Sequence, residues 1–195
     1  MPSRVEESFD ELWQRLRAGR GLTNTGDDPV FYLVFRPGEM LEVKRLRKLW
    51  AAKLAKQGWA MEVMSMADTV LEIFRSNELR HVWLASPSNT SFGRDSIAEI
   101  NQTLENVLTE GDALKKKIEE KLESLRGRSK TVLFITDLEA LHPYLRVGVL
   151  EQKLQGKFIV PTVILYPGVR DGKSTLRFLG FYPPDGNYRS VHIGG

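Results

Sequence analysis

The chain contains no cysteine among its 195 residues. Disulfide bonds, thiolate zinc sites and cysteine nucleophiles are therefore excluded. The histidines, His81, His142 and His192, lie too far apart in the sequence to form a local metal-binding motif. No Ser-His-Asp set and no pair of catalytic carboxylates can be recognised either. We therefore expect no catalytic residues, no metal site and no cofactor.

Long apolar stretches are also missing. The longest apolar run, around residues 158–166, is far shorter than the roughly 20 residues that a transmembrane helix needs. The N-terminus lacks the continuous apolar segment of a signal peptide. We therefore expect a cytoplasmic protein that makes no contact with a membrane.

The chain has no strong excess of charge of one sign. It carries 28 Lys and Arg against 25 Asp and Glu, a net charge of +3, and 42% of its residues are hydrophobic. These values are typical of a globular protein, and so weak a basic balance permits contact with nucleic acid without indicating it. The length suits one domain with its own core, so we expect a single domain over residues 1–195.

Apolar runs and amphipathic segments alternate along the chain. Residues 30–35 and 131–136 are continuous apolar runs rich in β-branched and aromatic side chains, as in strands that are buried on both faces of a parallel sheet. The pattern predicts an α/β fold with a mostly parallel sheet of about five strands, covered by helices on both faces. The predicted strands are 30–35, 60–66, 131–136, 158–166 and 175–182, and the predicted helices are 3–18, 39–57, 68–75 and 142–155.

The N-terminal helix, residues 3–18, is amphipathic and begins with a capping-box pattern, Ser3 followed by Glu6. We expect it to pack on the side of the domain. Its apolar face, and an aromatic group near the C-terminus, would support binding of a protein partner if they were exposed. The aromatic group consists of Tyr166, Phe181, Tyr182 and Tyr188.

A helical insertion is predicted over residues 94–126. Residues 81–85 before it fit either the end of a helix or a short strand, and residues 87–93 fit a loop. Two apolar stripes at helical spacing follow, separated by Gly111. Because Gly111 interrupts the seam, we expect two separate helices rather than a coiled coil. The stripes are Ile97, Ile100, Leu104, Val107 and Leu108, then Leu114, Ile118, Leu122 and Leu125.

Residues 167–174 come close to a phosphate-binding loop. The P-loop pattern G-x-x-x-x-G-K-[ST] has four residues between its glycines, whereas Gly168 and Gly172 enclose only three before Lys173 and Ser174. The residues after the loop, 175–182, have the composition of a strand and not of the helix whose N-terminus would hold phosphates. We therefore predict a hairpin with an antiparallel strand at the edge of the sheet.

Asp137 follows the strand 131–136 in the arrangement of a Walker B motif, with Glu139 two residues later. Without a P-loop partner a magnesium site is not predicted here. Asp137, Arg146 and the turn at 167–172 are expected to gather at the carboxyl edge of the sheet, where ligands of open α/β folds usually bind. An alternative is an ion pair between Asp137 and Arg146 that only ties the loop to the next helix. A degenerate P-loop-like nucleotide-binding protein remains a further, weaker hypothesis.

One face of the predicted helix 39–57 is basic. It could contact phosphates, although such faces are usually only solvated. A second basic run, Lys115 to Lys117, is diluted by nearby glutamates. Nucleic-acid binding is therefore an alternative hypothesis, carried by Lys44, Arg45, Arg47, Lys48, Lys53 and Lys56.

The C-terminal quarter combines Pro167-Gly168, Asp171-Gly172, Leu176-Arg177-Phe178 and Asn187-Tyr188. With these residues it resembles the BrxB family of bacteriophage exclusion (BREX) systems. Family members end in an apolar strand, a Pro-Gly turn with Asp-Gly, a Leu-Arg-x-aromatic strand and a tail with Asn-Tyr. A second similarity joins the strand 131–136 to Leu141-His142-Pro143-Tyr144-Leu145-Arg146, and the order of elements fits over residues 29–191. The matching C-terminal residues are Pro167, Gly168, Asp171, Gly172, Leu176, Arg177, Phe178, Gly180, Asn187, Tyr188 and Arg189.

The resemblance implies a role in antiviral defence, phage resistance and restriction. It implies a non-enzymatic adaptor that assembles with other BREX proteins: PglZ as the preferred direct partner, then the ATPase BrxC and the methyltransferase PglX. A homodimer stays open, and DNA contact is expected only within the assembly. The candidate binding residues are Asp137, Arg146, Gly168, Asp171, Gly172, Arg177, Asn187, Tyr188 and Arg189.

Overall fold

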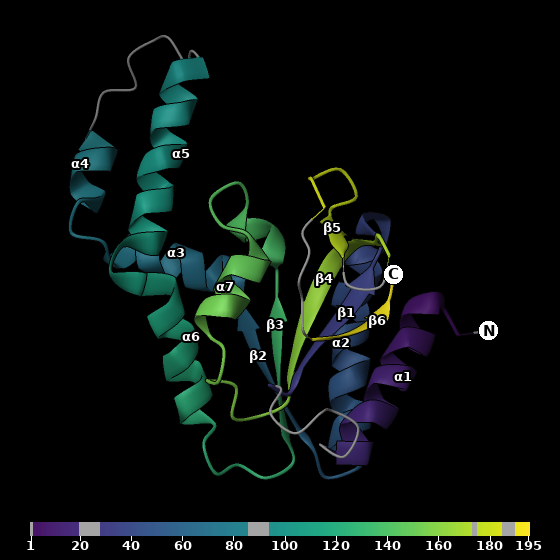
Figure 1. Ribbon diagram of the computed structural model, residues 1–195. Coiled ribbons are helices and arrows are strands. Elements are labelled where there is room, and N and C mark those ends of the chain that lie inside the picture. The colour runs from purple at the N-terminus through teal and green to yellow at the C-terminus, as the bar shows by residue number, and fades with distance from the viewer. Residues whose placement is uncertain (1, 20–27, 86–93, 173–174, 185–189) are drawn as a thin grey trace.

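The computed structural model describes residues 2–19, 28–85, 94–172, 175–184 and 190–195; the side chains of 83–85 and 94–97 lie outside this description. Its centre is a parallel sheet in the order β2-β3-β4-β1-β6 (Figure 1). In the central register, Leu33 of β1 lies opposite Leu165 of β4 and Ile193 of β6. The strands are β1 (Val30–Phe35), β2 (Ala60–Ser65), β3 (Thr131–Thr136), β4 (Thr162–Arg170) and β6 (Val191–Gly194). The predicted mostly parallel α/β fold is confirmed.

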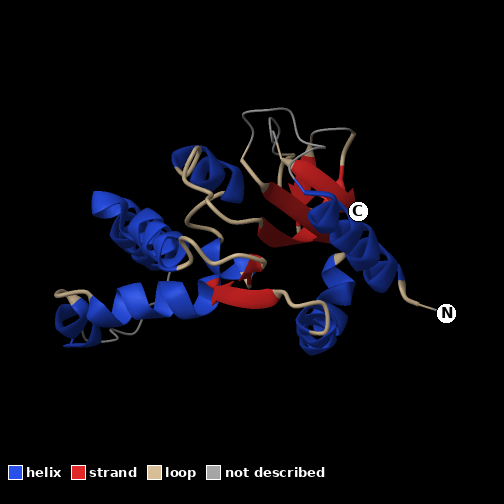
Figure 2. Cartoon of the chain, turned by 90° about the horizontal axis from the view of Figure 1, so that it is seen from below, coloured by secondary structure: helices blue, strands red, loops and turns tan. Residues whose placement is uncertain are grey.

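Helices cover both faces of the sheet (Figure 2). All six residues of β1 and of β3 are buried, as the continuous apolar runs predict. One face packs against α1 (Arg4–Ala18) and α2 (Met40–Ala55). The other packs against α3 (Met66–Ser76), the C-terminal end of α5 (Arg94–Thr109), α6 (Ala113–Ser124) and α7 (Val147–Lys153).

The N-terminal helix begins and packs as expected. The Ser3 N–H donates to the Glu6 carboxylate at 2.7 Å and the Glu6 N–H donates to Ser3 Oγ at 3.3 Å, so the capping box is formed. Phe9 of α1 stacks on Trp50 of α2 with 4.5 Å between ring centroids. The apolar face of α1 is buried against α2 and the sheet, so it is not exposed for a partner: Val5, Phe9, Leu12, Trp13 and Leu16.

The helical insertion consists of separate helices, as predicted. Gly111 has a φ of 56° within a short 3-10 turn, Glu110–Asp112, that separates α5 from α6. Residues 81–85 belong to a helix, α4 (Arg80–Ala85), and the predicted loop 87–93 lies outside the described residues. Together with α4, the N-terminal part of α5 projects beyond the carboxyl end of the sheet (Figure 1). We call residues 79–85 and 94–104 the helical arm.

The helix predicted at 142–155 begins later. A 3-10 turn, Leu138–Leu141, follows β3, and α7 starts only at Val147. His142 has extended backbone angles, φ −89° and ψ 142°. The reason is Pro143, because a residue before proline is disfavoured in the helical region.

The predicted C-terminal hairpin exists, but its boundaries differ from the prediction. β4 runs through the Pro-Gly dipeptide at 167–168 and pairs antiparallel with β5 (Leu176–Phe178), which is shorter than the predicted strand 175–182. Pro167 lies beyond the last pair of β4 with β3, at Ile164, and directly before the first pair of β4 with β5, Gly168 with Phe178. Its carbonyl accepts from Leu179 N–H at 2.8 Å. β5 pairs with β4 alone, off the path of the main sheet, whose outer strands are β2 and β6. The sequence pattern did not reveal β6.

Within the described part of the chain, no helix is both long enough and apolar enough to cross a membrane.

Candidate functional site: the carboxyl edge of the sheet

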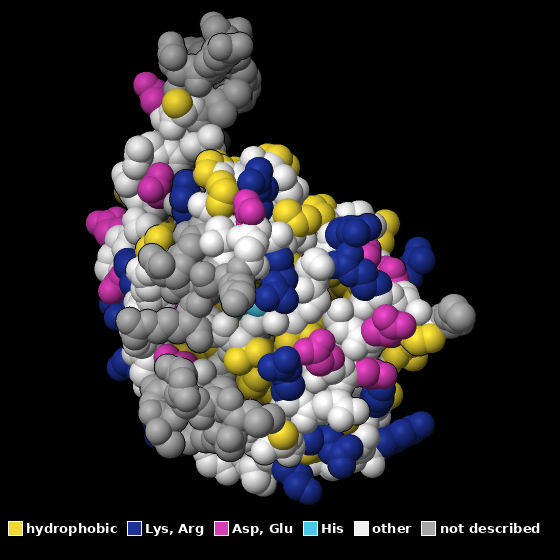
Figure 3. Space-filling model, turned by 45° about the vertical axis from the view of Figure 1, so that its right-hand side comes forward, with side chains coloured by type: hydrophobic (Ala, Val, Ile, Leu, Met, Phe, Trp, Pro, Cys, Tyr) yellow, Lys and Arg dark blue, Asp and Glu magenta, His cyan; other side chains and the backbone are white. Residues whose placement is uncertain are grey.

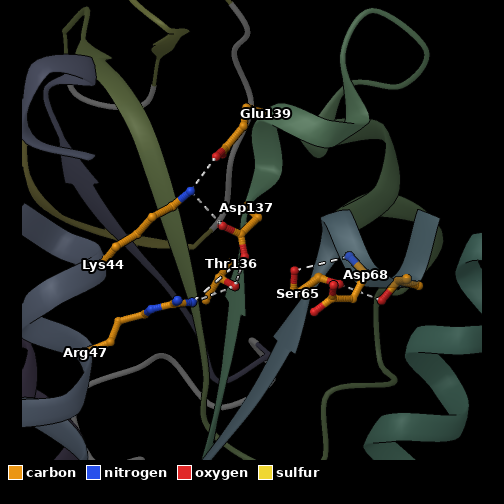
Figure 4. Close-up of polar contacts among 8 residues, drawn as sticks. Lys44, Arg47, Ser65, Asp68, Thr136, Asp137 and Glu139 are labelled. Atoms are coloured by element: carbon orange, nitrogen blue, oxygen red, sulfur yellow. Dashed lines mark hydrogen bonds and ion pairs between the residues drawn. The ribbon is translucent and has the colours of Figure 1, made fainter. Parts of the chain in front are cut away.

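A polar cluster lies where β2 and β3 end (Figure 4). Asp137 directly follows β3 and adopts left-handed backbone angles, with φ 58°, which Asp tolerates better than most residues. Its carboxylate points toward α2, which runs across this face of the sheet. We call the group the carboxyl-edge cluster: Lys44, Arg47, Ser65, Thr136, Asp137 and Glu139.

Two cations of α2 bind the acids of the cluster. Lys44 Nζ lies 3.3 Å from Asp137 Oδ1 and 3.4 Å from Glu139 Oε1. Arg47 Nη1 donates to Thr136 Oγ1 at 3.1 Å and lies 3.9 Å from Asp137 Oδ2. Thr136 Oγ1 in turn donates to Asp137 Oδ2 at 2.6 Å. The cluster therefore ties α2 to the end of β3.

The environment keeps both main charges ionised. Burial alone would raise the pKa of Asp137, but hydrogen bonds from Thr136, Ser65 and Lys44 outweigh it and hold that pKa below its ordinary value. Burial likewise opposes the charge of Lys44, yet the neighbouring Asp137 and Glu139 raise the pKa of Lys44. The cavity lined by this cluster holds only about 20 Å³, the space of roughly one water molecule.

The loop between β1 and α2 lies at the same edge, where open α/β folds often bind phosphate. Here the chain uses its own carboxylate: the Arg36 N–H donates to Glu39 Oε2 at 2.6 Å. Glu42 adds a second acid in the first turn of α2. An incoming phosphate would be repelled by both acids, so this loop supports a structural end of the helix and not a nucleotide site.

Arg146 does not join the Asp137 cluster. Among the described residues no ion pair links Arg146 to Asp137, so the expected pair between them is wrong, and Asp137 is neutralised from α2 instead. Arg146 lines a separate pocket of about 130 Å³ with aromatic walls. In that pocket the His142 ring stacks on Phe178, with 4.0 Å between centroids, and Tyr182 leans on His142 at 4.6 Å.

The turn between β4 and β5 is held by its own side chains. Arg177 Nη2 lies 2.7 Å from Asp171 Oδ2, and the Asp171 N–H donates to Thr175 O at 2.9 Å. Gly172 has a φ of 87°, which explains a glycine there. A strand and not a helix follows, which confirms the hairpin and removes the helix N-terminus that a P-loop needs. Lys173, Ser174, Asn187, Tyr188 and Arg189 lie outside the described residues.

The basic face of α2 is partly used within the chain. Lys44 and Arg47 belong to the carboxyl-edge cluster, and Lys53 forms an ion pair with Asp10 of α1. On the side of the molecule shown in Figure 3, acidic and basic side chains are interspersed among apolar ones. Of the aromatic group near the C-terminus, Tyr166 is buried, and Phe181 is 70% exposed.

A buried polar group was not predicted from the sequence. Tyr32 Oη donates to Glu151 Oε2 at 2.6 Å, and Ser190 Oγ donates to the other carboxylate oxygen of Glu151. Burial raises the pKa of Glu151 and lowers that of nearby His192 to about 4. These residues come from a strand, a short helix and a loop far apart in the sequence, so no local pattern marks them as a group.

Comparison with known proteins adds a family to this geometry. Neither the curated proteins nor the solved structures contain a match. The family model described as "BREX protein BrxB" matches residues 61–193, from β2 to β6, which is more than half of the chain. The match starts later than the resemblance predicted, after α2. The chain therefore belongs to the BrxB family and is a component of a BREX phage-defence system.

Proposed function

We propose that this BREX component is a non-enzymatic adaptor that joins other BREX subunits through protein–protein contacts. The observation that carries the proposal is the helical arm, which extends away from the sheet (Figure 1). Leu79, Val82 and Ile100 on the arm are 55%, 51% and 47% exposed. Apolar side chains that stay exposed on a projecting element favour a docking role.

The carboxyl-edge cluster supports the non-enzymatic part of the proposal. A general base or metal ligand needs a carboxylate that is free to accept a proton or a cation. Asp137 instead contacts Lys44, Arg47 and Thr136, and these contacts link α2 to β3. A structural role for these ionised groups explains their geometry without a reaction.

The family suggests which proteins the arm would contact. We propose PglZ as the direct partner, with BrxC and PglX as further members of the assembly. A homodimer through the same arm is the alternative within this proposal.

Co-purification from cells that carry the whole BREX gene cluster tests the proposal. The tagged protein should recover at least one other BREX subunit, and Leu79→Asp with Val82→Asp should lower that recovery by about tenfold, because hot-spot residues dominate such contacts. Val149→Asp is the matched control, since Val149 of α7 is an apolar side chain that is 42% exposed outside the arm.

Recovery of the tagged protein alone, or full recovery with the arm variant, would contradict the adaptor role of the arm. Recovery of only a second copy of this chain, lost in the arm variant, would assign the arm to a homodimer.

A further inference from the structure

The helix α2 has a second, exposed face that the fold does not use. Val43, Leu46, Trp50 and Leu54 point into the core between α2 and the sheet. On the opposite side, Leu41 is 69% exposed and Leu49 is 62% exposed. We call this side the α2 outer face: Leu41, Arg45, Lys48, Leu49, Ala52 and Lys56, all exposed.

The cations of α2 fall into two groups. Lys44, Arg47 and Lys53 form ion pairs with acids of the chain. In the part of the chain that the structure describes, Arg45, Lys48 and Lys56 form no ion pair. Along the outer face, Arg45 and Lys48 lie between the two leucines and Lys56 follows them. The face is therefore both apolar and positively charged.

This mixture points to one kind of partner. A phosphate backbone is bound by cations and polar groups and gains nothing from exposed leucines. An amphipathic helix with acidic flanks satisfies both halves of the surface: its apolar stripe covers Leu41 and Leu49, and its carboxylates face Arg45, Lys48 and Lys56. We propose that the α2 outer face docks an acidic amphipathic helix of another BREX subunit.

The dimensions set the size of that helix. From Leu41 to Lys56 the face spans 15 steps of about 1.5 Å, or ~22 Å, so a partner helix of about four turns covers it. This inference rests on the proposed adaptor function and gives the chain a docking surface separate from the helical arm. An adaptor that joins two subunits requires two such surfaces.

A photo-crosslinking amino acid at position 52 tests the inference. Ala52 lies between the leucines and the unpaired cations, so this substitution leaves them in place. The tagged protein is irradiated in cells that carry the whole BREX cluster, and the attached peptide is identified by mass spectrometry. We expect a segment of another BREX subunit that has apolar residues at helical spacing and an excess of Asp and Glu.

Variants separate the charge and apolar contributions. Arg45→Glu with Lys48→Glu should lower the yield of this cross-link about tenfold, because like charges then face the partner. Leu41→Asp with Leu49→Asp should have a comparable effect. Lys116→Glu is the matched control: it is an exposed lysine of α6, away from this face, and should leave the yield unchanged within about twofold.

Three results would overturn the inference: a cross-link to nucleic acid, a cross-link to a segment without excess negative charge, or none while other BREX subunits still co-purify. The third result leaves the adaptor function intact if the co-purification is lost in the Leu79→Asp, Val82→Asp variant, because the arm then holds the other subunits.

Discussion

Individual partly buried titratable groups make the stability of this fold depend on pH. The ring of His192 lies in β6 beside Tyr32, with 5.3 Å between centroids, and burial lowers its pKa from 6.5 to about 4. Between these two values the unfolded chain binds a proton at this residue and the folded chain does not. Acidification therefore draws the equilibrium toward the unfolded state, and the stability from neutral His192 is lost as the pH falls below 6.5.

His192→Gln should remove this contribution. We expect the free energy of unfolding of the unmodified protein to drop by about 1 kcal/mol more than that of the variant between pH 7 and pH 5, a value reduced because the ring is only partly buried. Urea denaturation at the two pH values measures it. His81→Gln, at an exposed ring, is the control and should follow the parent. An equal drop in parent and His192→Gln would show that His192 does not carry the effect.

Glu151, which binds Tyr32 beside His192, changes the stability with pH in the opposite direction. Its pKa is raised by burial, despite hydrogen bonds from Ser190 and Tyr32 to the carboxylate. A raised carboxyl pKa favours the folded state at low pH, and this contribution is lost as the pH rises through that pKa. The two groups therefore partly offset each other in weakly acidic solution, which is why the single His192 substitution is the more informative experiment.

Among the elements, β4 depends most on one small residue. A Cβ at Gly168 would collide with the carbonyl oxygen of Arg177 in β5 and with the ring of Tyr166. The close approach of β4 to β5 therefore requires glycine at position 168. The φ of Gly168 is not positive, so backbone conformation is not the reason for a glycine there.

Gly168→Ala should destabilise the protein by about 1–3 kcal/mol through overpacking. Thermal or urea unfolding measures the change. Gly38→Ala is the matched control, since a Cβ at Gly38 meets nothing within 4 Å and its φ is also not positive. If the free energies of unfolding of the two variants differ by less than about 0.5 kcal/mol, then β4 and β5 can move apart without destabilising the protein, and the close approach is not required.

The elements also show how far sequence patterns reach. Strands β1 and β3 could be predicted because short continuous runs of β-branched and aromatic residues are typical of strands that are buried on both faces of a sheet. The end of β4 could not, because Pro-Gly usually marks a turn and only the pairing with β5 overrides that preference. β6 has four residues and one polar side chain, too little for a strand pattern.

The carboxyl-edge cluster was predictable only in part, because some of its residues are brought together by tertiary structure and not by a local pattern. Parallel strands bring their carboxyl ends to one edge, which located Asp137. Its partners Lys44 and Arg47 lie on a helix far away in the chain, and a basic helix face carries no mark of which cations are paired.

For the whole molecule, the remaining question is whether the carboxyl edge binds nucleotide. A nucleotide-dependent protein would use Lys173 for the phosphates and Asp137 for Mg²⁺. The hairpin removes the helix N-terminus, Glu39 caps the β1–α2 loop, and Asp137 is already bound by Lys44 and Arg47. All three features oppose binding at the one edge where it is expected.

We therefore predict that millimolar Mg-ATP leaves the melting temperature of the protein unchanged, because a ligand stabilises only a fold that binds it. Asp137→Asn should lower the melting temperature to the same extent with and without Mg-ATP, since it weakens the contacts to Lys44 and Arg47. Lys173→Ala should have no effect on the response to nucleotide. A rise of several degrees with Mg-ATP that disappears in both variants would contradict this prediction and, with it, the non-enzymatic role proposed for the chain.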